Sequence, residues 1–561
     1  MSHTARAGLS AALLGLVLGC LALGPALGWG FTLIQDMVFV PDPAFSRFTF
    51  GLAGGAARVV PSDAVVTALA QLLPAELVQK LILLAIFVLG CSGAALLVPS
   101  SSVGPRLVAG VFYVWNPYVA ERLLIGQWAL LLGYAGLPWV VRAVWSGRRT
   151  ALAVLPAAVG GFAAMTVTAL TALPLAVARW TSGNGSGNGS GNGSGNGSGN
   201  GARWAGPARV VVVLAVFSLP WLVPTALRPE GLRGDPVGVE AFAARADTPF
   251  GAVGSLLSLG GIWNMYAVPP GYETVPGAVA RLLITLTGLA FFLRGAVPYR
   301  KGLAAAAAVG LGVACVGVSE PGRAAFRWAV ELWPGFAVFR DAQQFVAPLA
   351  LASAVGLGLL ATRVTGSSEL SSSDGGRGSP SRGSRPVSRG RGWVVVLVLV
   401  PLAVLPTMAW GALGRLGAIA YPEGWTDARE VIGRDPAPGD VLVLPFESYR
   451  RFPWNGGRAV LDPAQRFFAA SGRRVVTNDA VRVGELLVRS EDPRAQAVDH
   501  VLRSPSPDLP GAGFRFVIVN AGTPAERQRF AGWLRTATLV VDARDLRLYR
   551  FDGPVRSIPP Q

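Results

Sequence analysis

Long apolar runs separated by polar connections dominate the chain up to Trp410, and this pattern predicts membrane-spanning helices. A span needs about 20 predominantly apolar residues to cross roughly 30 Å of hydrocarbon. The pattern indicates spans at residues 8–28, 80–98, 106–117, 127–145, 208–227, 278–296, 302–319, 343–363 and 393–412.

The apolar stretch at 150–180 is too long for one straight crossing. It is interrupted by Pro156, Gly160, Gly161 and Pro174, and such breaks favour a hairpin of two short or re-entrant segments. The expected total is then about eleven spans. Residues 1–412 are therefore predicted to form a polytopic, mainly α-helical membrane bundle.

The remaining residues, 413–561, have the mixed composition of a soluble domain, in which apolar runs are short and charges are frequent. Helices are expected at 426–433 and 524–535, and strands at 440–445, 473–477, 514–520, 538–542 and 546–551. This alternation predicts a C-terminal α/β domain of modest size. It contains neither a Gly-rich phosphate loop nor a nucleophile elbow.

Composition supports a membrane protein, because apolar residues make up 52% of the chain and charged residues only 14%. The net charge of +17 comes from basic residues that are spread over particular connections between apolar runs. We interpret them as topological signals and not as a nucleic-acid surface. The three cysteines, Cys20, Cys91 and Cys315, lie in apolar runs, so no disulfide framework is expected outside the bundle.

The placement of charge predicts the orientation in the cell membrane. With Arg6 in the cytoplasm, the basic connections, including the run at 363–391, fall on the cytoplasmic side and the acidic connections fall outside. A single crossing at 150–180 would put the basic run outside, which favours the hairpin. The N-terminus is then cytoplasmic, and the C-terminal domain is extracytoplasmic.

Two low-complexity inserts, at about 181–203 and 365–392, are rich in Gly and Ser and are expected to be disordered cytoplasmic connections. The outer loops at 30–79 and 228–277 are long for simple connections. An amphipathic helix is predicted at 63–79 in the first of them, where it can lie in the membrane interface.

Asp36 is the first candidate for chemistry, because it lies just beyond the outer end of the first span. A carboxylate held there could deprotonate an acceptor hydroxyl, and neighbouring aromatic residues would raise its basicity by desolvation. The alternative is a solvated loop acid that helps to orient the span.

Glu121 and Arg122 form a second candidate, at the outer end of the span at 106–117. Charges bordering hydrocarbon are either paired or directed toward a cavity. A clamp between adjacent helices is one reading, and substrate binding is the other, since Arg122 could hold a phosphate.

The segment that contains Arg340, Asp341 and Gln344 is a third candidate, directly before a span on the outer side. We expect Arg340 at the start of that helix, where its guanidinium and the free backbone N–H groups can bind an anionic head group. Interfacial anchoring is the alternative.

Trp263, Asn264 and Tyr266 in the second long loop offer flat aromatic surfaces and an amide, which suit sugar binding. Aromatic anchoring at the membrane surface is the alternative explanation.

Taken together, these motifs resemble actinobacterial relatives of the C-type (GT-C fold) glycosyltransferases, and in particular the arabinofuranosyltransferases of the cell envelope. The resemblance rests on the Asp in the first outer loop, the Asn-Pro-Tyr…Glu-Arg-Leu-Leu-Ile-Gly-Gln-Trp segment, the Phe-Arg-Asp-x-Gln-x-Phe segment and the outward α/β tail. It covers most of the membrane domain.

The resemblance implies an inverting transferase that takes a sugar from a polyprenyl-phosphate donor and passes it to an envelope glycan or glycolipid outside the cell. Asp36 would be the base, Arg340 a phosphate contact and Arg122 a weaker one. Many relatives carry two acids close together in the first outer loop, whereas five residues separate Asp36 from Asp42. This spacing leaves a requirement for a divalent cation open.

A non-catalytic membrane scaffold or lipid-handling protein of envelope assembly is the alternative function. An ion-coupled transporter is disfavoured, because the middles of the spans carry almost no acids or bases for a relay.

Overall fold

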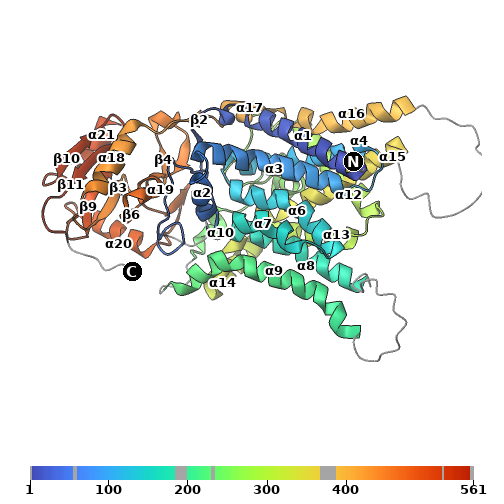
Figure 1. Cartoon of the computed structure of the whole chain (residues 1–561), viewed down its shortest axis with the longest axis horizontal. Coiled ribbons are helices and arrows are strands. Elements are labelled where there is room, and N and C mark those ends of the chain that lie inside the picture. The colour runs from blue at the N-terminus through green and yellow to red at the C-terminus, as the bar shows by residue number, and fades with distance from the viewer. Residues whose placement is uncertain are drawn as a thin grey trace, which may run out of the picture.

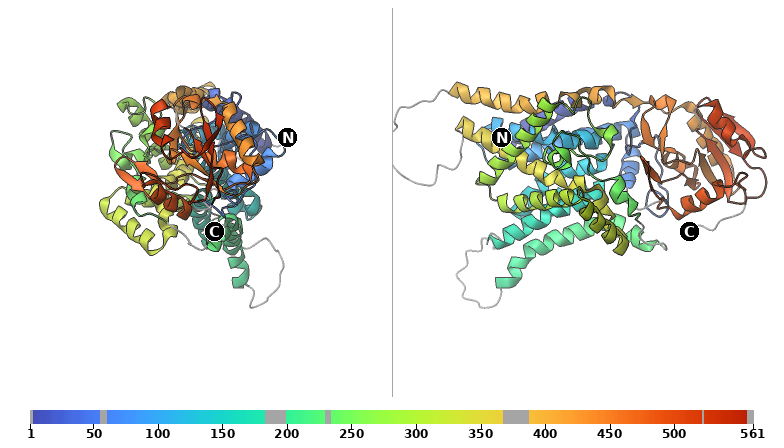
Figure 2. Two further views of the ribbon diagram at one scale, coloured as in Figure 1. Left: turned by 90° about the vertical axis from the view of Figure 1, so that its left-hand side faces the viewer. Right: turned by 180° about the vertical axis from the view of Figure 1, so that it is seen from behind.

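The helical bundle and the C-terminal α/β domain lie end to end, and the N-terminus is at the end of the bundle that is far from the α/β domain (Figures 1 and 2). This computed structural model describes residues 3–54, 60–182, 199–228, 234–366, 387–520 and 523–555. The expected disordered inserts fall largely outside the described residues, at 183–198 and 367–386.

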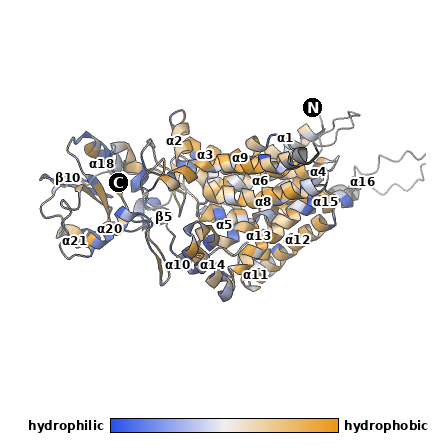
Figure 3. Cartoon of the chain, turned by 90° about the horizontal axis from the view of Figure 1, so that it is seen from below, coloured by the Kyte–Doolittle hydropathy of each residue, from blue (hydrophilic) through white to orange (hydrophobic). Residues whose placement is uncertain are grey.

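Seven helices in the described part of the chain are long and apolar enough to cross a membrane individually. They are α1 (His3–Leu23), α3 (Ala75–Leu97), α6 (Trp128–Ser146), α8 (Phe162–Thr181), α9 (Gly199–Leu227), α12 (Val275–Arg294) and α15 (Ala347–Thr365). Hydrophobic residues cover this bundle, while the α/β domain is more polar (Figure 3). The chain is therefore a multi-pass membrane protein, as its sequence predicts.

Two pairs of helices are long and apolar enough for a span only when taken together, and each pair is bent. The first joins α13 (Arg300–Val316) to α14 (Glu320–Leu332) at 96°, and the second joins α16 (Val387–Val404) to α17 (Ala409–Gly414) at 67°. Counting each pair once gives nine candidate spans among the described residues.

The two other expected spans are short helices. α4 (Val103–Val114) and α7 (Thr150–Gly160) have 12 and 11 residues, so each is under about 20 Å long and does not cross the hydrocarbon by itself. The break predicted within 150–180 lies at Gly161, with a φ of 78°. The expectation that both parts of this hairpin are short is wrong for α8, which has 20 residues and includes Pro174.

The amphipathic helix predicted at 63–79 is also divided. α2 (Ser62–Ala70) ends before a turn, and α3 begins after its N-cap residue, Pro74. The residue before a proline is disfavoured in the helical region, so Pro74 separates α2 from the span that follows it. A position of α2 in the membrane interface stays a prediction.

The central sheet of the α/β domain has five strands in the order β10-β11-β9-β3-β6. β3 (Asp440–Leu444) lies parallel to β6 (Val475–Val476) and β9 (Phe514–Val519), while β11 (Arg547–Arg550) is antiparallel to β9 and β10 (Thr538–Asp542). All five strands were predicted. The helices α18 (Glu423–Arg434) and α21 (Pro524–Ala531) were predicted as well.

Several short elements of this domain were not predicted. They are the hairpin ladders of β4 (Tyr449–Arg451) with β5 (Ala459–Leu461) and of β7 (Val481–Val483) with β8 (Leu486–Val488), together with α19 (Ala464–Phe467) and α20 (Pro493–Leu502).

The α/β domain is joined to the loop at 30–79, the predicted first outer loop, by a shared two-stranded sheet. β1 (Phe31–Thr32) pairs with β2 (Ala418–Ile419), and Gln79 of α3 exchanges two hydrogen bonds of 2.8 and 2.9 Å with the backbone of Thr32. One continuous hydrophobic core extends from the bundle into the α/β domain as far as Trp425 and Phe467. The two parts therefore pack as one body.

Small residues allow a close contact between α12 and α15. A Cβ atom added to Gly356 would lie 1.7 Å from the carbonyl oxygen of Gly288. Small residues at such positions let helix backbones approach closely within a membrane.

Replacing Gly356 by Ala should therefore separate α12 from α15 and lower the stability of the bundle by about 1–3 kcal/mol. Thermal unfolding of the purified protein in detergent measures the effect. Gly312→Ala in α13 is the matched control, because no atom lies within 4 Å of the added Cβ. Equal melting temperatures for the two variants would contradict the packing argument.

Candidate functional site

A cavity of about 420 Å³ lies where the bundle meets the α/β domain. Its walls come from the first outer loop, the N-terminal end of α6, the α7–α8 junction, the C-terminal part of α9, the segment before α15 and the α/β domain. Its polar and aromatic lining includes Asp36, Asp63, Gln127, Trp128, Trp221, Phe242, Trp263, Arg340, Asp341, Gln344, Tyr449 and Arg466.

Asp36 occupies the tip of a tight turn that is held from two sides. Ile34 and Met37 close the turn with reciprocal backbone hydrogen bonds of 3.3 and 2.8 Å. On the bundle side, the Asp36 N–H donates to the Ile125 carbonyl at 3.1 Å. On the other side, Gln35 joins the edge of β5, accepting from Leu461 N–H at 2.8 Å. These main-chain hydrogen bonds thus fix the backbone from which the Asp36 side chain extends.

The Asp36 side chain is half-buried in the cavity wall, and the Tyr449 hydroxyl donates a hydrogen bond to its Oδ1 atom. Burial raises the pKa of Asp36 to about 6, the Tyr449 hydrogen bond opposes the rise, Asp341 adds to it and Arg466 reduces it. A carboxylate with this pKa is ionised at neutral pH and is more basic than a solvated aspartate. These are the properties of a general base.

Arg340 and its neighbours lie in η4 (Pro334–Val346), a run of 3₁₀ turns that leads into α15. The expectation that Arg340 begins the helix is wrong, because α15 starts at Ala347. Pro348 lies in the first turn of α15, where proline is favoured because its fixed φ suits a helix start. The Arg340 guanidinium lies 3.2 Å from Glu491 and stacks 5.2 Å from the Phe242 ring centroid.

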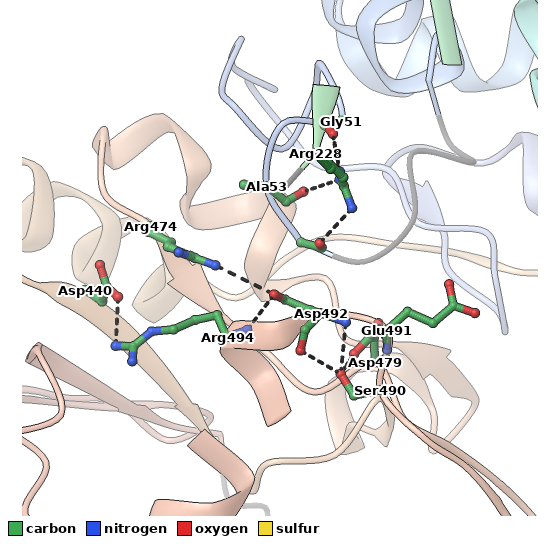
Figure 4. A network of polar contacts seen from close by, with 11 residues as sticks. Gly51, Ala53, Arg228, Asp440, Arg474, Asp479, Ser490, Glu491, Asp492 and Arg494 are labelled. Atoms are coloured by element: carbon green, nitrogen blue, oxygen red, sulfur yellow. Dashed lines mark hydrogen bonds and ion pairs between the residues drawn. The ribbon is translucent and has the colours of Figure 1, made fainter. Parts of the chain in front are cut away.

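A network of polar contacts holds the segment that carries Glu491 (Figure 4). The Glu491 N–H donates to Asp479 at 3.1 Å, and Asp492 accepts from the Arg494 N–H at 2.9 Å and lies 3.7 Å from Arg474. Figure 4 also shows Arg228, at the end of α9, donating to the carbonyl groups of the first outer loop. The backbone that carries Glu491, whose carboxylate faces Arg340, is therefore tied to the rest of the α/β domain.

Arg122 lies behind the cavity wall and is 3% exposed. Its guanidinium is 3.6 Å from Asp341 and donates to Gln127 at 3.2 Å. Gln127 in turn donates to Asp341 at 3.4 Å. The sequence suggested a clamp of Glu to Arg between adjacent helices, whereas the partner of Arg122 is Asp341 of η4, which Arg122 supports from outside the cavity.

Glu121 does not line the cavity. Its Oε1 atom, Asp247 Oδ2 and Tyr272 Oη lie 2.9, 2.5 and 2.7 Å from the position of a Cβ atom on Gly260, so they gather around this glycine. The residue is buried, at 3% exposed.

The three residues of the predicted sugar-binding loop separate in the structure. Trp263 lines the cavity and packs edge-to-face on Phe242, with ring centroids 4.8 Å apart. The Asn264 side chain accepts from the Tyr266 N–H at 3.0 Å and so caps a 3₁₀ turn. Tyr266 is 68% exposed, outside the cavity.

The second acid of the first outer loop, Asp42, also lies outside the cavity, with its side chain 80% exposed and 3.2 Å from Arg429. Among the described residues, no three His, Cys, Asp or Glu side chains are placed to hold a metal ion together. A requirement for a divalent cation stays open, as the sequence left it.

Sequence reasoning missed Tyr449 and Arg466, which reach the cavity from the α/β domain, and Asp63, which pairs with Arg466 at 3.0 Å. Tyr449 and Arg466 come from β4 and α19, two short elements with no periodic signal of their own. Tyr449 lies beside Asp36 because β4 pairs with β5 and β5 pairs with Gln35.

No family model and no curated protein matches the sequence. Among solved structures, the chain is similar to the cryo-EM structure of the arabinofuranosyltransferase AftD from mycobacteria, with a TM-score of 0.60 and 18% sequence identity. The chain has a GT-C-like glycosyltransferase fold. The similarity covers 99% of this chain and 40% of AftD, so this chain spans about two fifths of the length of AftD.

A second solved structure with the GT-C-like fold is that of ArnT from Cupriavidus metallidurans bound to undecaprenyl phosphate. Its TM-score is 0.38 and its sequence identity 14%, over 97% of both chains. The fold that the sequence resemblance implies is thus confirmed by the AftD comparison.

Gly126 should be essential for the Asp36 turn. It has a φ of 80°, and a Cβ atom there would lie 2.3 Å from Met37 N. Gly126→Ala should therefore push the turn out and speed hydrogen exchange at residues 35–37, measured by mass spectrometry. Gly271→Ala is the control, since Gly271 also has a positive φ, of 67°, but open space around it. Unchanged exchange in Gly126→Ala would refute this account.

Proposed function

We propose that the protein is a membrane glycosyltransferase that moves a sugar from a polyprenyl-phosphate donor to an envelope glycan or glycolipid on the outer face of the membrane. The observation that carries the proposal is a half-buried carboxylate, Asp36, in the wall of a cavity that also presents Arg340. The GT-C-like fold supports a transferase of this class.

The proposed reaction is an inverting displacement at the anomeric carbon of the donor. Asp36 accepts the proton of an acceptor hydroxyl as the new bond from the acceptor oxygen to carbon forms. The bond from carbon to the phosphate oxygen breaks on the opposite face, and the polyprenyl phosphate leaves with the electron pair. A positioned cation stabilises the charge that develops on this leaving group.

Arg340 is the proposed contact for the leaving phosphate. Its present partner is Glu491, so a phosphate would take the place of a carboxylate on the guanidinium. Arg122 does not line the cavity, and its proposed role is to hold Asp341 in place. Glu121 is proposed as a structural residue.

The apolar part of the cavity suits the lipid and the sugar. Phe162 and Trp221, which line it, belong to α8 and α9, and only 11% of the span in α9 is buried. A carrier lipid can therefore approach from the bilayer beside α9. Trp263 provides an aromatic face on which a sugar ring can pack. Asn264 caps the next turn and Tyr266 is exposed outside the cavity, so neither is proposed to share this role.

The orientation proposed for this reaction places the cavity outside the cell. The N-terminus lies at the end of the bundle opposite to the α/β domain (Figure 1), which is consistent with a cytoplasmic N-terminus and an extracytoplasmic α/β domain.

Asp36→Asn should reduce sugar transfer at least about a hundredfold, since a general base contributes roughly 10²–10⁴-fold, while expression and melting temperature are retained. Asp42→Asn is the matched control from the same loop and should keep its activity, because Asp42 lies outside the cavity. Lipid-linked sugars and envelope glycans are compared by mass spectrometry in a deletion strain that carries each variant. Full complementation by Asp36→Asn would favour the non-catalytic scaffold.

Arg340→Ala should weaken binding of polyprenyl phosphate by roughly ten- to a hundredfold, the value of a hydrogen bond to a charged group. Glu491→Gln should tighten binding, because it removes the carboxylate that competes for Arg340. Titration of the purified protein with undecaprenyl phosphate, followed by native mass spectrometry, measures both effects. Arg429→Ala, which removes an arginine outside the cavity, serves as the control. Unchanged affinity in Arg340→Ala would rule out the phosphate contact.

A further inference from the structure

The α/β domain contacts the Asp36 turn at three successive points. Asn455 donates to the Leu33 carbonyl at 3.2 Å, Gln35 joins the edge of β5, and the Tyr449 hydroxyl donates to Asp36 Oδ1. Tyr449 reaches the carboxylate because its partner across the β4–β5 ladder is Leu461, the residue whose N–H donates to Gln35.

We propose that Tyr449 is the positioning residue of the base: its hydroxyl holds one oxygen of the Asp36 carboxylate, so that the α/β domain completes the catalytic site. This inference rests on the proposed function of Asp36. It assigns the α/β domain a direct part in the reaction.

The geometry restricts what the carboxylate can do. With Oδ1 engaged by Tyr449, Oδ2 is the atom that meets an acceptor hydroxyl in the cavity, and rotation of the carboxylate is limited. A base that is held in one orientation avoids the cost of ordering it during the reaction.

Tyr449 acts as a donor at every pH at which the enzyme works. Its partial burial and the adjacent Asp36 hold the pKa of its phenol well above the ordinary value, so the hydroxyl keeps its proton. The ionised form of Asp36 is the one that this donor stabilises.

The sign of the effect follows from the charges around Asp36. Burial and Asp341 of η4 raise the pKa of Asp36, whereas Tyr449 of β4 and Arg466 of α19, itself paired with Asp63 of α2, lower it. The Tyr449 hydrogen bond is the largest of the effects that lower the pKa of Asp36, so loss of the hydroxyl leaves the effect of burial less opposed. The pKa of Asp36 then rises, and more of the base is protonated at neutral pH.

The protonation of Asp36 can be measured without substrate. A water-soluble carbodiimide couples glycine ethyl ester to protonated carboxyl groups, and peptide mass spectrometry reports the extent at Asp36 in the full-length protein between pH 4.5 and 8. Wild-type labelling should rise as the pH falls through about 6. In Tyr449→Phe the midpoint should lie about one pH unit higher.

Tyr421→Phe is the matched control. The Tyr421 hydroxyl donates to the Phe39 carbonyl at 3.0 Å, so this variant also removes one hydrogen bond between the α/β domain and the first outer loop. It does not touch the carboxylate, and its midpoint should equal that of the wild type. A midpoint in Tyr449→Phe that matches the wild type overturns the proposal, because a merely structural tyrosine would alter stability and leave the titration in place.

A second measurement covers the case in which Tyr449→Phe does not fold. Biosynthetic replacement of tyrosine by 3-fluorotyrosine makes the phenol a stronger donor, so the labelling midpoint of Asp36 should move to lower pH. No movement in that protein would overturn the proposal as well. The activity of Asp36→Asn separates the two claims. Sugar transfer retained in Asp36→Asn would refute the role of Asp36 as the base. If Asp36→Asn is inactive but the labelling midpoint in Tyr449→Phe equals that of the wild type, only the role of Tyr449 is refuted.

Discussion

The backbone hydrogen bonds of the Asp36 turn are the constraint on which the site depends. A four-residue turn is held between the α5 (Pro117–Leu124) to α6 junction and the edge of β5, and each side contributes main-chain hydrogen bonds. Main-chain contacts of this kind fix a position without help from side chains. The carboxylate at the tip is then placed by two parts of the chain that are both packed into the same hydrophobic core.

Three ion pairs hold together the elements around the cavity. Arg340 faces Glu491, Arg122 faces Asp341 and Arg466 faces Asp63, and in each pair the two residues come from different elements. A buried or half-buried cation is costly unless a partner is nearby, so each pair holds two elements in register. The pairing of Arg340 supports the proposed phosphate contact, because an anionic ligand in the cavity would meet a guanidinium that is already positioned and would displace the Glu491 carboxylate from it.

The sequence predicted the parts of the site that lie at the ends of apolar runs. Asp36, Arg340, Asp341, Gln344 and Trp263 all line the cavity. The first four lie close to the end of a predicted span, and polar side chains at span ends on one side of a bundle are close to a common surface. Asn264 and Tyr266 share the same local pattern but turn away. Their loop conformation, in which Asn264 caps the next turn, is decided by hydrogen bonds that the pattern does not encode.

The sequence by itself determined that this chain crosses a membrane several times and carries an α/β domain, because hydropathy and the alternation of short apolar runs are local properties. Only the tertiary structure decided which helices are complete, which are bent and which residues complete the cavity. Tyr449 and Asp36 are 413 residues apart, and no periodicity connects them. Their contact exists because the first outer loop joins the sheet of a domain made at the other end of the chain.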